Sequence, residues 1–526
     1  MNRIRVLDCT LRDGGYCNEW KFGFNNIKEI IKCLSDANID IIECGFLTQK
    51  VQYKRNISKF TSLEEVKELI PKDKKGKMYV CLLNYGEYNI DDIPMCDNSS
   101  LDGIRVAFHK RDMEQALEFC EKLKEKKYEV FVQAMVSLNY SDEEFLDLVQ
   151  KVNCIKPYAF YIVDSFGAMK SKDLIRLFYN VEHNLEKDIY IGYHSHNNMQ
   201  LAYSNAQALC SIQTRRKLII DSSIFGMGRG AGNLNTELFL EYLNETENGN
   251  YKLKPILFII DKILNRFYQQ NYWGYSLPNY LSASYNVHPN YASYLTDKQT
   301  LTVEAIDIIF AMMDDDKKIT YDQKYIEQIY VQYMNSREGN EEHFALLKKE
   351  LENKVVLVIA PGKSCEEEKE KIIQYCKDEN VISISINFEY PYLDTEYIFL
   401  SNLRRYREIN KNIQNKCIVT SNIPVEKAFL RPNYSKLMNE IEAVKDNAGM
   451  MLIQYLIMLG VKKIVLAGMD GYSHEASRNY ANDELELITT NSIWDAMNEG
   501  MEIMLKRFNN SVEIEFLTTP RYVNCD

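Results

Sequence analysis

The sequence has few of the features that mark secreted, membrane or nucleic-acid-binding proteins. No apolar run is long enough to cross a bilayer, and the N-terminus leads into an apolar strand-like segment without a secretory signal. The net charge of −12 disfavours nonspecific binding to DNA or to anionic lipid. The 13 cysteines show no C-x-x-C pair and no metal-ligand spacing, which indicates reduced thiols. We therefore expect a cytoplasmic protein that binds neither nucleic acid nor membrane.

The composition is that of a folded protein with more than one domain. Hydrophobic residues make up 46% and charged residues 26% of the 526 positions, which is typical of globular chains and allows two or three cores. We expect an α/β protein with three parts: a (β/α)8 TIM barrel over residues 1–250, a helical capping domain and linker over 251–349, and a Rossmann-like open α/β domain over 350–526.

The barrel is predicted from eight β-like runs that alternate with amphipathic helical segments. Alternating β and α segments imply a parallel sheet, and eight such units in this length favour a closed barrel. An open doubly wound sheet is the alternative, but the Gly-rich phosphate turn after its first strand is absent. The predicted strands are Arg3–Cys9, Ile39–Gly45, Lys77–Leu83, Gly103–Phe108, Tyr128–Val136, Ala159–Asp164, Ile189–His194 and Leu218–Ile224.

Polar residues gather where these strands end, which is where barrel enzymes carry their chemistry. The first strand runs into L-D-C-T-L-R-D-G-G, so that Arg12 and Asp13 stand side by side. Asp13 could bind a hard divalent cation, with Arg12 holding an oxyanion beside it. A surface ion pair is the simpler interpretation of two such neighbours. Glu43 and Asp164 end the second and sixth strands and are candidate substrate-binding residues.

The pair His194-x-His196 is the most specific local signal. Residues two apart on a strand point to the same side, so both imidazoles can reach one cation, and only seven histidines occur in the chain. With Asp13 they make a two-histidine, one-carboxylate set that leaves positions open for substrate and water. Asn233, after a Gly-rich turn, could add a ligand oxygen or could simply stabilise the turn. Such ligands suit Mg²⁺ or Mn²⁺.

Five blocks, in order, carry a family resemblance. They are T-L-R-D-G (10–14), E-C-G-F (43–46), D-S-F-G-A-M (164–169), H-S-H-N-N (194–198) and G-x-G-x-G-A-G-N-L-x-T-E (226–237). Together they resemble the HMG-CoA lyase-like superfamily of metal-dependent enzymes, and the third block resembles its 4-hydroxy-2-oxovalerate aldolase branch. The resemblance implies that Asp13, His194 and His196 hold the cation and that Arg12 stabilises an enolate.

The chain departs from that branch at the acid/base. A histidine expected a few residues after the Arg-Asp pair is replaced by Gly15-Tyr16-Cys17, so Tyr16 becomes the candidate. The resemblance implies carbon–carbon bond cleavage or formation between a 2-oxo acid and an aldehyde, in a homo-oligomer. The alternatives are an acyl-CoA condensing enzyme of the isopropylmalate synthase type, or a surface-sugar transferase whose barrel makes a precursor.

The segment after the barrel is helical and aromatic. Ile256–Tyr268 and Val303–Met313 are predicted helices, and a small domain covering the barrel mouth would suit this pattern. His288 lies in this segment. It is either a structural histidine among tyrosines or a further catalytic residue.

The C-terminal part shows a second set of apolar strands, beginning at Lys354–Ala360. Pro361-Gly362-Lys363-Ser364 follows the first strand but is not a P-loop, because Leu357 stands where that motif needs a glycine. Blocks 356–364, 384–388 and 447–472 resemble two groups of proteins. One group is the bacterial sialyltransferases that use CMP-sialic acid, and the other is the 6-hydroxymethylpterin diphosphokinase-like proteins. The resemblance implies a nucleotide or nucleotide-sugar ligand, and a domain used only for assembly is the alternative. The candidate nucleotide-binding residues are Gly362, Ser364, Asn387 and Asp470.

Overall fold

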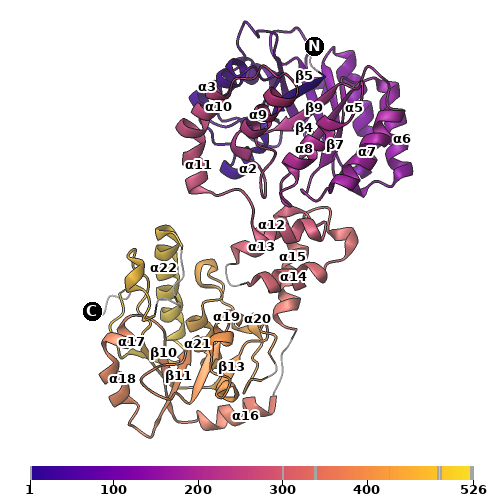
Figure 1. Ribbon diagram of the computed structural model, residues 1–526. Coiled ribbons are helices and arrows are strands. Elements are labelled where there is room, and N and C mark those ends of the chain that lie inside the picture. Colours follow the sequence, from indigo (N-terminus) through magenta and orange to yellow (C-terminus); the bar gives the residue numbers. More distant parts are fainter. Residues whose placement is uncertain are drawn as a thin grey trace. The chain divides into compact units, whose positions relative to one another are not determined.

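The computed structural model describes residues 3–298, 301–336, 341–425, 427–482, 485 and 489–521. These residues form two compact units, one of residues 3–298 and 306–322, the other of residues 301–305 and 323–521. Each unit contains its own parallel sheet, visible in Figure 1 with its surrounding helices. No helix among the described residues combines the length and the apolar character that a membrane span needs.

The first unit is the predicted (β/α)8 barrel. Its sheet closes because β1 pairs with β2 on one side, with Leu7 opposite Ile41, and with β9 on the other, with Ile4 opposite Leu218. A two-residue strand, β3 (Lys59–Phe60), extends the edge of β2. The eight barrel strands are β1 (Ile4–Asp8), β2 (Ile41–Leu47), β4 (Met78–Asn84), β5 (Gly103–Phe108), β6 (Glu129–Ala134), β7 (Ala159–Asp164), β8 (Tyr190–Ser195) and β9 (Leu218–Ser222). All eight match the runs predicted from the sequence.

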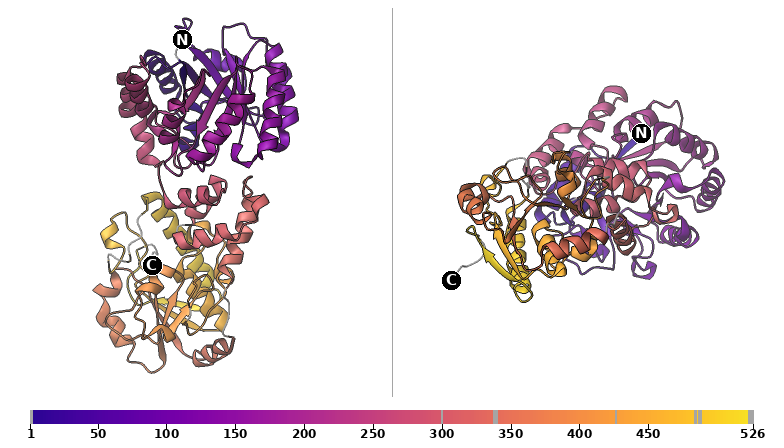
Figure 2. Two further views of the ribbon diagram at one scale, coloured as in Figure 1. Left: turned by 45° about the vertical axis from the view of Figure 1, so that its right-hand side comes forward. Right: turned by 90° about the horizontal axis from the view of Figure 1, so that it is seen from below.

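Alternation along the strands separates two cores. Leu7 and Tyr161 point into the barrel, whereas their neighbours Val6 and Phe160 pack against the outer helices. Figure 2 shows the helices surrounding the strands. They are α3 (Phe24–Asp36), α5 (Met113–Glu125), α6 (Asp142–Ile155), α7 (Ser171–Asn184), α8 (Ala202–Ser211) and α9 (Thr236–Thr246), with a short α4 (Leu63–Lys67).

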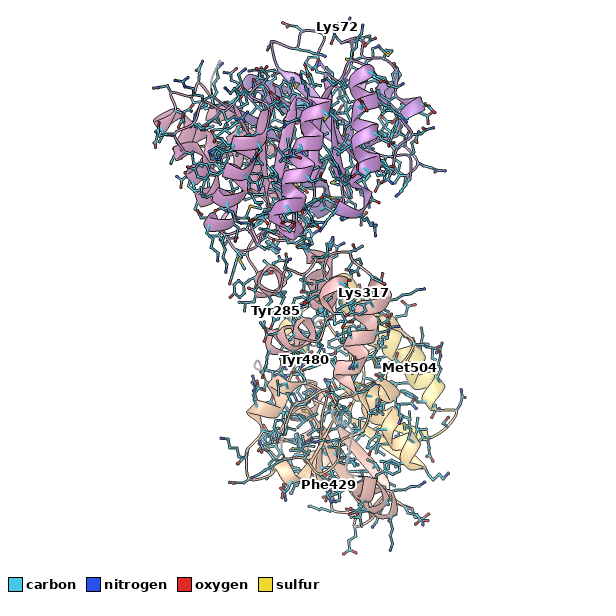
Figure 3. All side chains as sticks on the ribbon, turned by 90° about the vertical axis from the view of Figure 1, so that its right-hand side faces the viewer. Lys72, Tyr285, Lys317, Phe429, Tyr480 and Met504 are labelled. Carbon is cyan, nitrogen blue, oxygen red and sulfur yellow. The ribbon has the colours of Figure 1, made fainter. Side chains whose placement is uncertain are left out.

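Helices after the barrel contact it along one side and at its carboxyl-terminal end. α10 (Leu253–Ile259) and α11 (Asn265–Gln270), joined by a π-helical turn, bury Ile256 and Ile263. α12 (Leu277–Ser284) and α13 (Pro289–Asp297) lie next, and Figure 3 labels Tyr285 between them. Asn286 donates to the side chain of Asn139, which follows β6, at 2.9 Å. These helices therefore touch the loops at the carboxyl ends of the strands.

The second unit contains a six-stranded parallel sheet in the order β13-β12-β11-β10-β14-β15. Its strands are β10 (Val355–Ile359), β11 (Val381–Ile386), β12 (Tyr397–Leu400), β13 (Cys417–Val419), β14 (Lys463–Ala467) and β15 (Glu513–Phe516). Consecutive strands run outward from β10 in one direction before β14 adds on its other side. The strand order therefore reverses between β10 and β14, where open α/β sheets carry their ligands.

Helices of the second unit are mostly short. α15 (Gln323–Met334) lies near its start, whereas α14 (Val303–Ala311) crosses the unit boundary and has most of its residues in the first unit. α21 (Ala448–Leu459) ends at Gly460, whose φ of +85° is the left-handed conformation that glycine favours. Phe429, labelled in Figure 3, stacks on His343 with 4.9 Å between ring centroids. The others are α16 (Glu341–Glu350), α17 (Ser364–Glu367), α18 (Lys369–Tyr375), α19 (Leu403–Glu408), α20 (Tyr434–Leu437) and α22 (Asn491–Phe508).

Candidate active site

Asp13, His194 and His196 meet at the carboxyl-terminal end of the barrel. Asp13 ends α1 (Thr10–Asp13), a single turn after β1, and the histidines lie at and just after the end of β8. Asp13 Oδ2 is 3.3 Å from His194 Nε2 and 3.7 Å from His196 Nε2. Ligands at right angles on one cation at about 2.1 Å lie about 3 Å apart, so the three atoms fit a shared ion.

Asn233 completes this group. Its amide nitrogen donates to Asp13 Oδ2 at 2.6 Å, and its Oδ1 is buried without a hydrogen-bond partner among the described residues. Buried polar atoms are nearly always bonded, so an orphaned oxygen on a side chain that contacts Asp13 indicates a missing cation or donor. The residues present therefore fit a divalent metal ion.

Cys9 also approaches the site. One ligand atom from each of Cys9, Asp13 and His194 lies within 4.8 Å of the others, which could hold a metal ion. Burial, however, raises the pKa of the Cys9 thiol well above its ordinary value, and the thiol donates to Ser222 O at 3.3 Å. A neutral thiol is a poor ligand. His196 is the better third ligand, because burial lowers its pKa to about 3 and keeps its imidazole neutral.

Two of these ligands, Asp13 and His194, belong to a closed ring of buried ionisable side chains, which we call the charge ring. Arg12 contacts Asp13 at 3.0 Å and Glu43 at 2.9 Å, and Glu43 contacts Arg105 at 2.8 Å. Arg105 then pairs with Asp221, whose Oδ2 lies 2.9 Å from His194 Nδ1 and so returns the ring to Asp13. The members are Asp13, Arg12, Glu43, Arg105, Asp221 and His194.

The charge balance of the ring favours a cation. Three carboxylates and two guanidinium groups leave one negative charge when His194 is neutral. Burial by itself would raise the pKa of Asp13, but Arg12 and the two histidines hold that pKa well below its usual range. Asp13 is therefore ionised and can serve as an anionic ligand.

Arg105 and Asp221 are members of the charge ring that were not among the candidate site residues predicted from the sequence. They come from the middle of β5 and from β9, and both are fully buried. A charged residue inside an otherwise apolar strand can be recognised in the sequence. It indicates a buried ion pair, because such a charge must have a partner inside the barrel.

The other predicted barrel residues occupy different places. Asp164 accepts from the amides of Ala168 and Met169 at 2.9 and 3.1 Å, so its carboxylate organises the loop after β7. Tyr16, on α2 (Gly15–Asn18), is 42% exposed, and the Arg229 guanidinium lies 5.5 Å from its ring centroid. His288 Nε2 lies 3.4 Å from Arg229 Nη1.

The predicted nucleotide-binding residues lie at the strand ends of the second sheet. Ser364 donates its amide to Asp470 at 2.7 Å, and its hydroxyl also bonds this carboxylate, so the ends of β10 and β14 are tied together. Gly362 lies against Asp470, since an added Cβ would come within 2.8 Å of its Oδ2. Asn387 lines a separate cavity of about 250 Å³ with Phe388, Tyr390 and other residues.

Comparisons with known proteins concern the barrel. The HMGL-like family model matches residues 3–257. The 4-hydroxy-2-oxovalerate aldolase of Geobacillus genomosp. 3 is 28% identical over 248 residues, which are 46% of this chain and 70% of that protein. The enzyme of the same name from Pelotomaculum thermopropionicum is 27% identical over 246 residues, with the same shares.

Solved structures of similar proteins also match the barrel. The N-terminal domain of a proposed aldolase from Bacteroides vulgatus is 26% identical, with a TM-score of 0.50, and the match covers 59% of this chain and 100% of that one. Rhizobium etli pyruvate carboxylase, 14% identical with a TM-score of 0.50, shares the fold over 66% of this chain and 38% of its own. Residues 3–257 therefore match the HMGL-like family model and share the barrel fold of these structures.

Proposed function

We propose that the barrel makes or breaks a carbon–carbon bond through the enolate of pyruvate or another 2-oxo acid, using Mg²⁺ or Mn²⁺. The observation that carries the proposal is that the charge ring and the adjoining His196 bring an ionised carboxylate, two imidazoles and a guanidinium together at one end of the barrel. A cation held by Asp13, His194, His196 and Asn233 would supply Lewis-acid polarisation of the keto oxygen.

Arg12 has an unused N–H donor that could stabilise the negative charge of an enolate. Its Nε and Nη1 are used by Glu43 and Asp13, but its Nη2 is buried without a hydrogen-bond partner among the described residues. Because the two carboxylates fix the guanidinium, Nη2 can donate to a substrate oxygen as negative charge develops on it. We propose that Arg12 stabilises the enolate oxygen in this way.

Bond formation also needs proton transfer: the methyl group of the 2-oxo acid loses a proton to form the enolate, and the aldehyde oxygen gains one when the new bond forms. Tyr16 is our candidate for this step, since it is partly exposed at the same end of the barrel and lies beside Arg229. The second substrate would be an aldehyde. Glu43 contributes indirectly, since it positions Arg12 from within the charge ring.

Deuterium exchange into the methyl group of pyruvate, followed by NMR, tests this function without knowledge of the aldehyde. We expect exchange that stops with EDTA and returns with Mg²⁺ or Mn²⁺. The double variant His194→Ala/His196→Ala should lose both bound metal and exchange, whereas His183→Ala, at an exposed site on α7, should keep both. Exchange into acetyl-CoA in place of pyruvate would favour the acyl-CoA alternative, and full metal content in the double variant would contradict the ligand assignment.

For the second unit we propose a nucleotide or nucleotide-sugar ligand. The observation in favour is the cavity at the end of β11, where Asn387 lies beside the aromatic rings of Phe388 and Tyr390. The Ser364 amide is already bonded to Asp470, so a phosphate there would have to displace a carboxylate. Calorimetry of the full chain with cytidine, uridine, guanosine and adenosine nucleotides tests the proposal. If none of these nucleotides gives a heat of binding, the proposal fails and the domain is better explained as an assembly module.

A further inference from the structure

Arg229 is a half-buried cation at the barrel mouth without a counter-charge. Among the described residues, no carboxylate lies within ion-pair distance of its guanidinium. Its Nη2 donates to the carbonyl oxygen of Ser165 at 3.0 Å, but its Nε is buried without a partner in the described part of the chain. A guanidinium held in this way has donors left for an anion.

The imidazole beside it adds a second unused donor. His288 Nδ1 accepts from the amide of Asn290 at 3.2 Å, so in the neutral ring the proton is on Nε2. That Nε2–H faces Arg229 Nη1, 3.4 Å away, and two donors cannot bond each other. Burial and Arg229 lower the pKa of His288 well below its ordinary value, which agrees with a neutral ring. Two converging donors need an acceptor between them.

A cavity lies at the same end of the barrel as these donors. It measures about 230 Å³ and is lined by His109, Lys110 and Arg111 after β5, by residues after β6, and by Ile319 and Thr320. Ser165 connects it to Arg229, since the Ser165 hydroxyl accepts from the amide of Val136, a lining residue, while its carbonyl accepts from Arg229.

The backbone at the rim of this cavity is strained. Val136 has a φ of +54°, a left-handed conformation that is unfavourable for a β-branched residue. The Ser165 hydroxyl holds it there at 2.8 Å. Such strain is retained where a surface has a specific shape to keep.

From this geometry we propose that Arg229 and His288 donate together to an oxygen of an acidic substrate group, a carboxylate or a phosphate. The inference rests on the proposed function, in which two substrates meet at this end of the barrel. The acidic group has two sources. It is either the carboxylate of the 2-oxo acid or an acidic group on the aldehyde, whose chain would extend into the cationic cavity.

The test compares Arg229→Gln with Arg266→Gln, which removes an exposed arginine on α11 from the same unit. Binding of inorganic phosphate, measured by calorimetry on the full chain, should weaken at least tenfold in Arg229→Gln and stay unchanged in Arg266→Gln. His288→Leu should weaken it likewise. His288→Gln should restore most of the affinity, because the Gln amide supplies a donor.

Kinetic arms distinguish the two sources. If the group is that of the 2-oxo acid, Arg229→Gln raises the KM for pyruvate at least tenfold in the exchange reaction. If it belongs to the aldehyde, pyruvate exchange is unchanged and the preference for 4-oxobutanoate over neutral propanal falls at least tenfold. The inference is overturned if neither phosphate, pyruvate nor 4-oxobutanoate depends on Arg229. Arg229-dependent phosphate binding without any exchange would instead uphold the inference and refute the proposed function.

Discussion

Arg12 and Asp13 are neighbours in the chain, but the other members of the charge ring come from four other strands. These four residues lie within a stretch of 179 positions, from 43 to 221, and the barrel brings them into one ring with the pair. They are Glu43, Arg105, His194 and Asp221. Each carboxylate in the ring has two cationic or imidazole partners, so removal of one member leaves the next with an unpaired charge, at a cost of about 3–5 kcal/mol. Conservative variants are therefore the informative ones at this scale.

Arg12→Lys should separate catalysis from folding. Lysine keeps the positive charge but has no planar fork with which to contact Asp13, Glu43 and a substrate oxygen together. We expect pyruvate exchange to fall at least about a hundredfold, with metal content unchanged and a melting temperature within a few degrees of wild type. Exchange near the wild-type rate would show that Arg12 has no part in stabilising the enolate.

Asp221→Asn should weaken metal binding although Asp221 is not a ligand. Its carboxylate accepts from His194 Nδ1–H, which leaves the Nε2 lone pair directed toward Asp13 and the cation site. Loss of such a partner typically costs 10–100-fold in affinity. Titration with Mn²⁺, followed by electron paramagnetic resonance, would measure this, with the exposed Asp188→Asn as the control. Equal affinity in the two variants would contradict the positioning role.

At the scale of elements, the end of β1 is joined to β9 and α9 through Asp8. Its carboxylate accepts from the amide of Thr10 at 3.0 Å and from the hydroxyl of Thr236 at 2.7 Å, and Thr236 also bonds Ser222. This junction closes the barrel next to the charge ring. Burial is the main reason that the pKa of Asp8 rises to about 6.

The raised pKa predicts a pH-dependent stability. The folded state holds the Asp8 proton more tightly than the unfolded chain, so the stabilisation is full below pH about 4 and is lost as the pH rises through about 6. Asp8→Asn keeps an acceptor for Thr10 and a group that can bond Thr236, without the charge. We expect the variant to gain about 2 kcal/mol on wild type between pH 4.5 and pH 7 in urea unfolding. A difference that stays constant over this range would contradict a protonated Asp8.

At the scale of the whole molecule, the boundary between the units falls within the helical segment. Residues 306–322 group with the barrel, whereas 301–305 and α15 group with the second sheet. The three-part division expected from the sequence stays a prediction. α15 buries Ile326, Tyr330 and Met334 within its own unit, so a barrel fragment that ends near residue 345 would expose them.

Two truncations test where the barrel ends as a folding unit. A fragment of residues 1–322 should fold and keep metal-dependent exchange within a few-fold of the full chain. A fragment of residues 1–250 should not, because it loses the buried side chains Ile256, Ile259, Ile263 and Leu264. At about 1.5–3 kcal/mol each, these match the whole stability of a typical domain. A cooperative thermal transition in the shorter fragment would contradict this.

The sequence by itself determined the elements and the first members of the site. Periodicity located all eight barrel strands, because buried parallel strands are short apolar runs between amphipathic helices. Arg12 and Asp13 are consecutive in the sequence. His194 and His196 are two residues apart, which puts their side chains on one side of a strand.

Only the tertiary structure decided which distant charges meet. Arg105 and Asp221 sit inside apolar strands without a motif, and their partners follow from closure of the barrel and from strand register, which local sequence does not specify. The same holds for Arg229 and His288, 59 residues apart, whose relation depends on how α13 packs over the strand ends. Local patterns depend on neighbouring residues, whereas a site built from side chains of several strands depends on long-range packing.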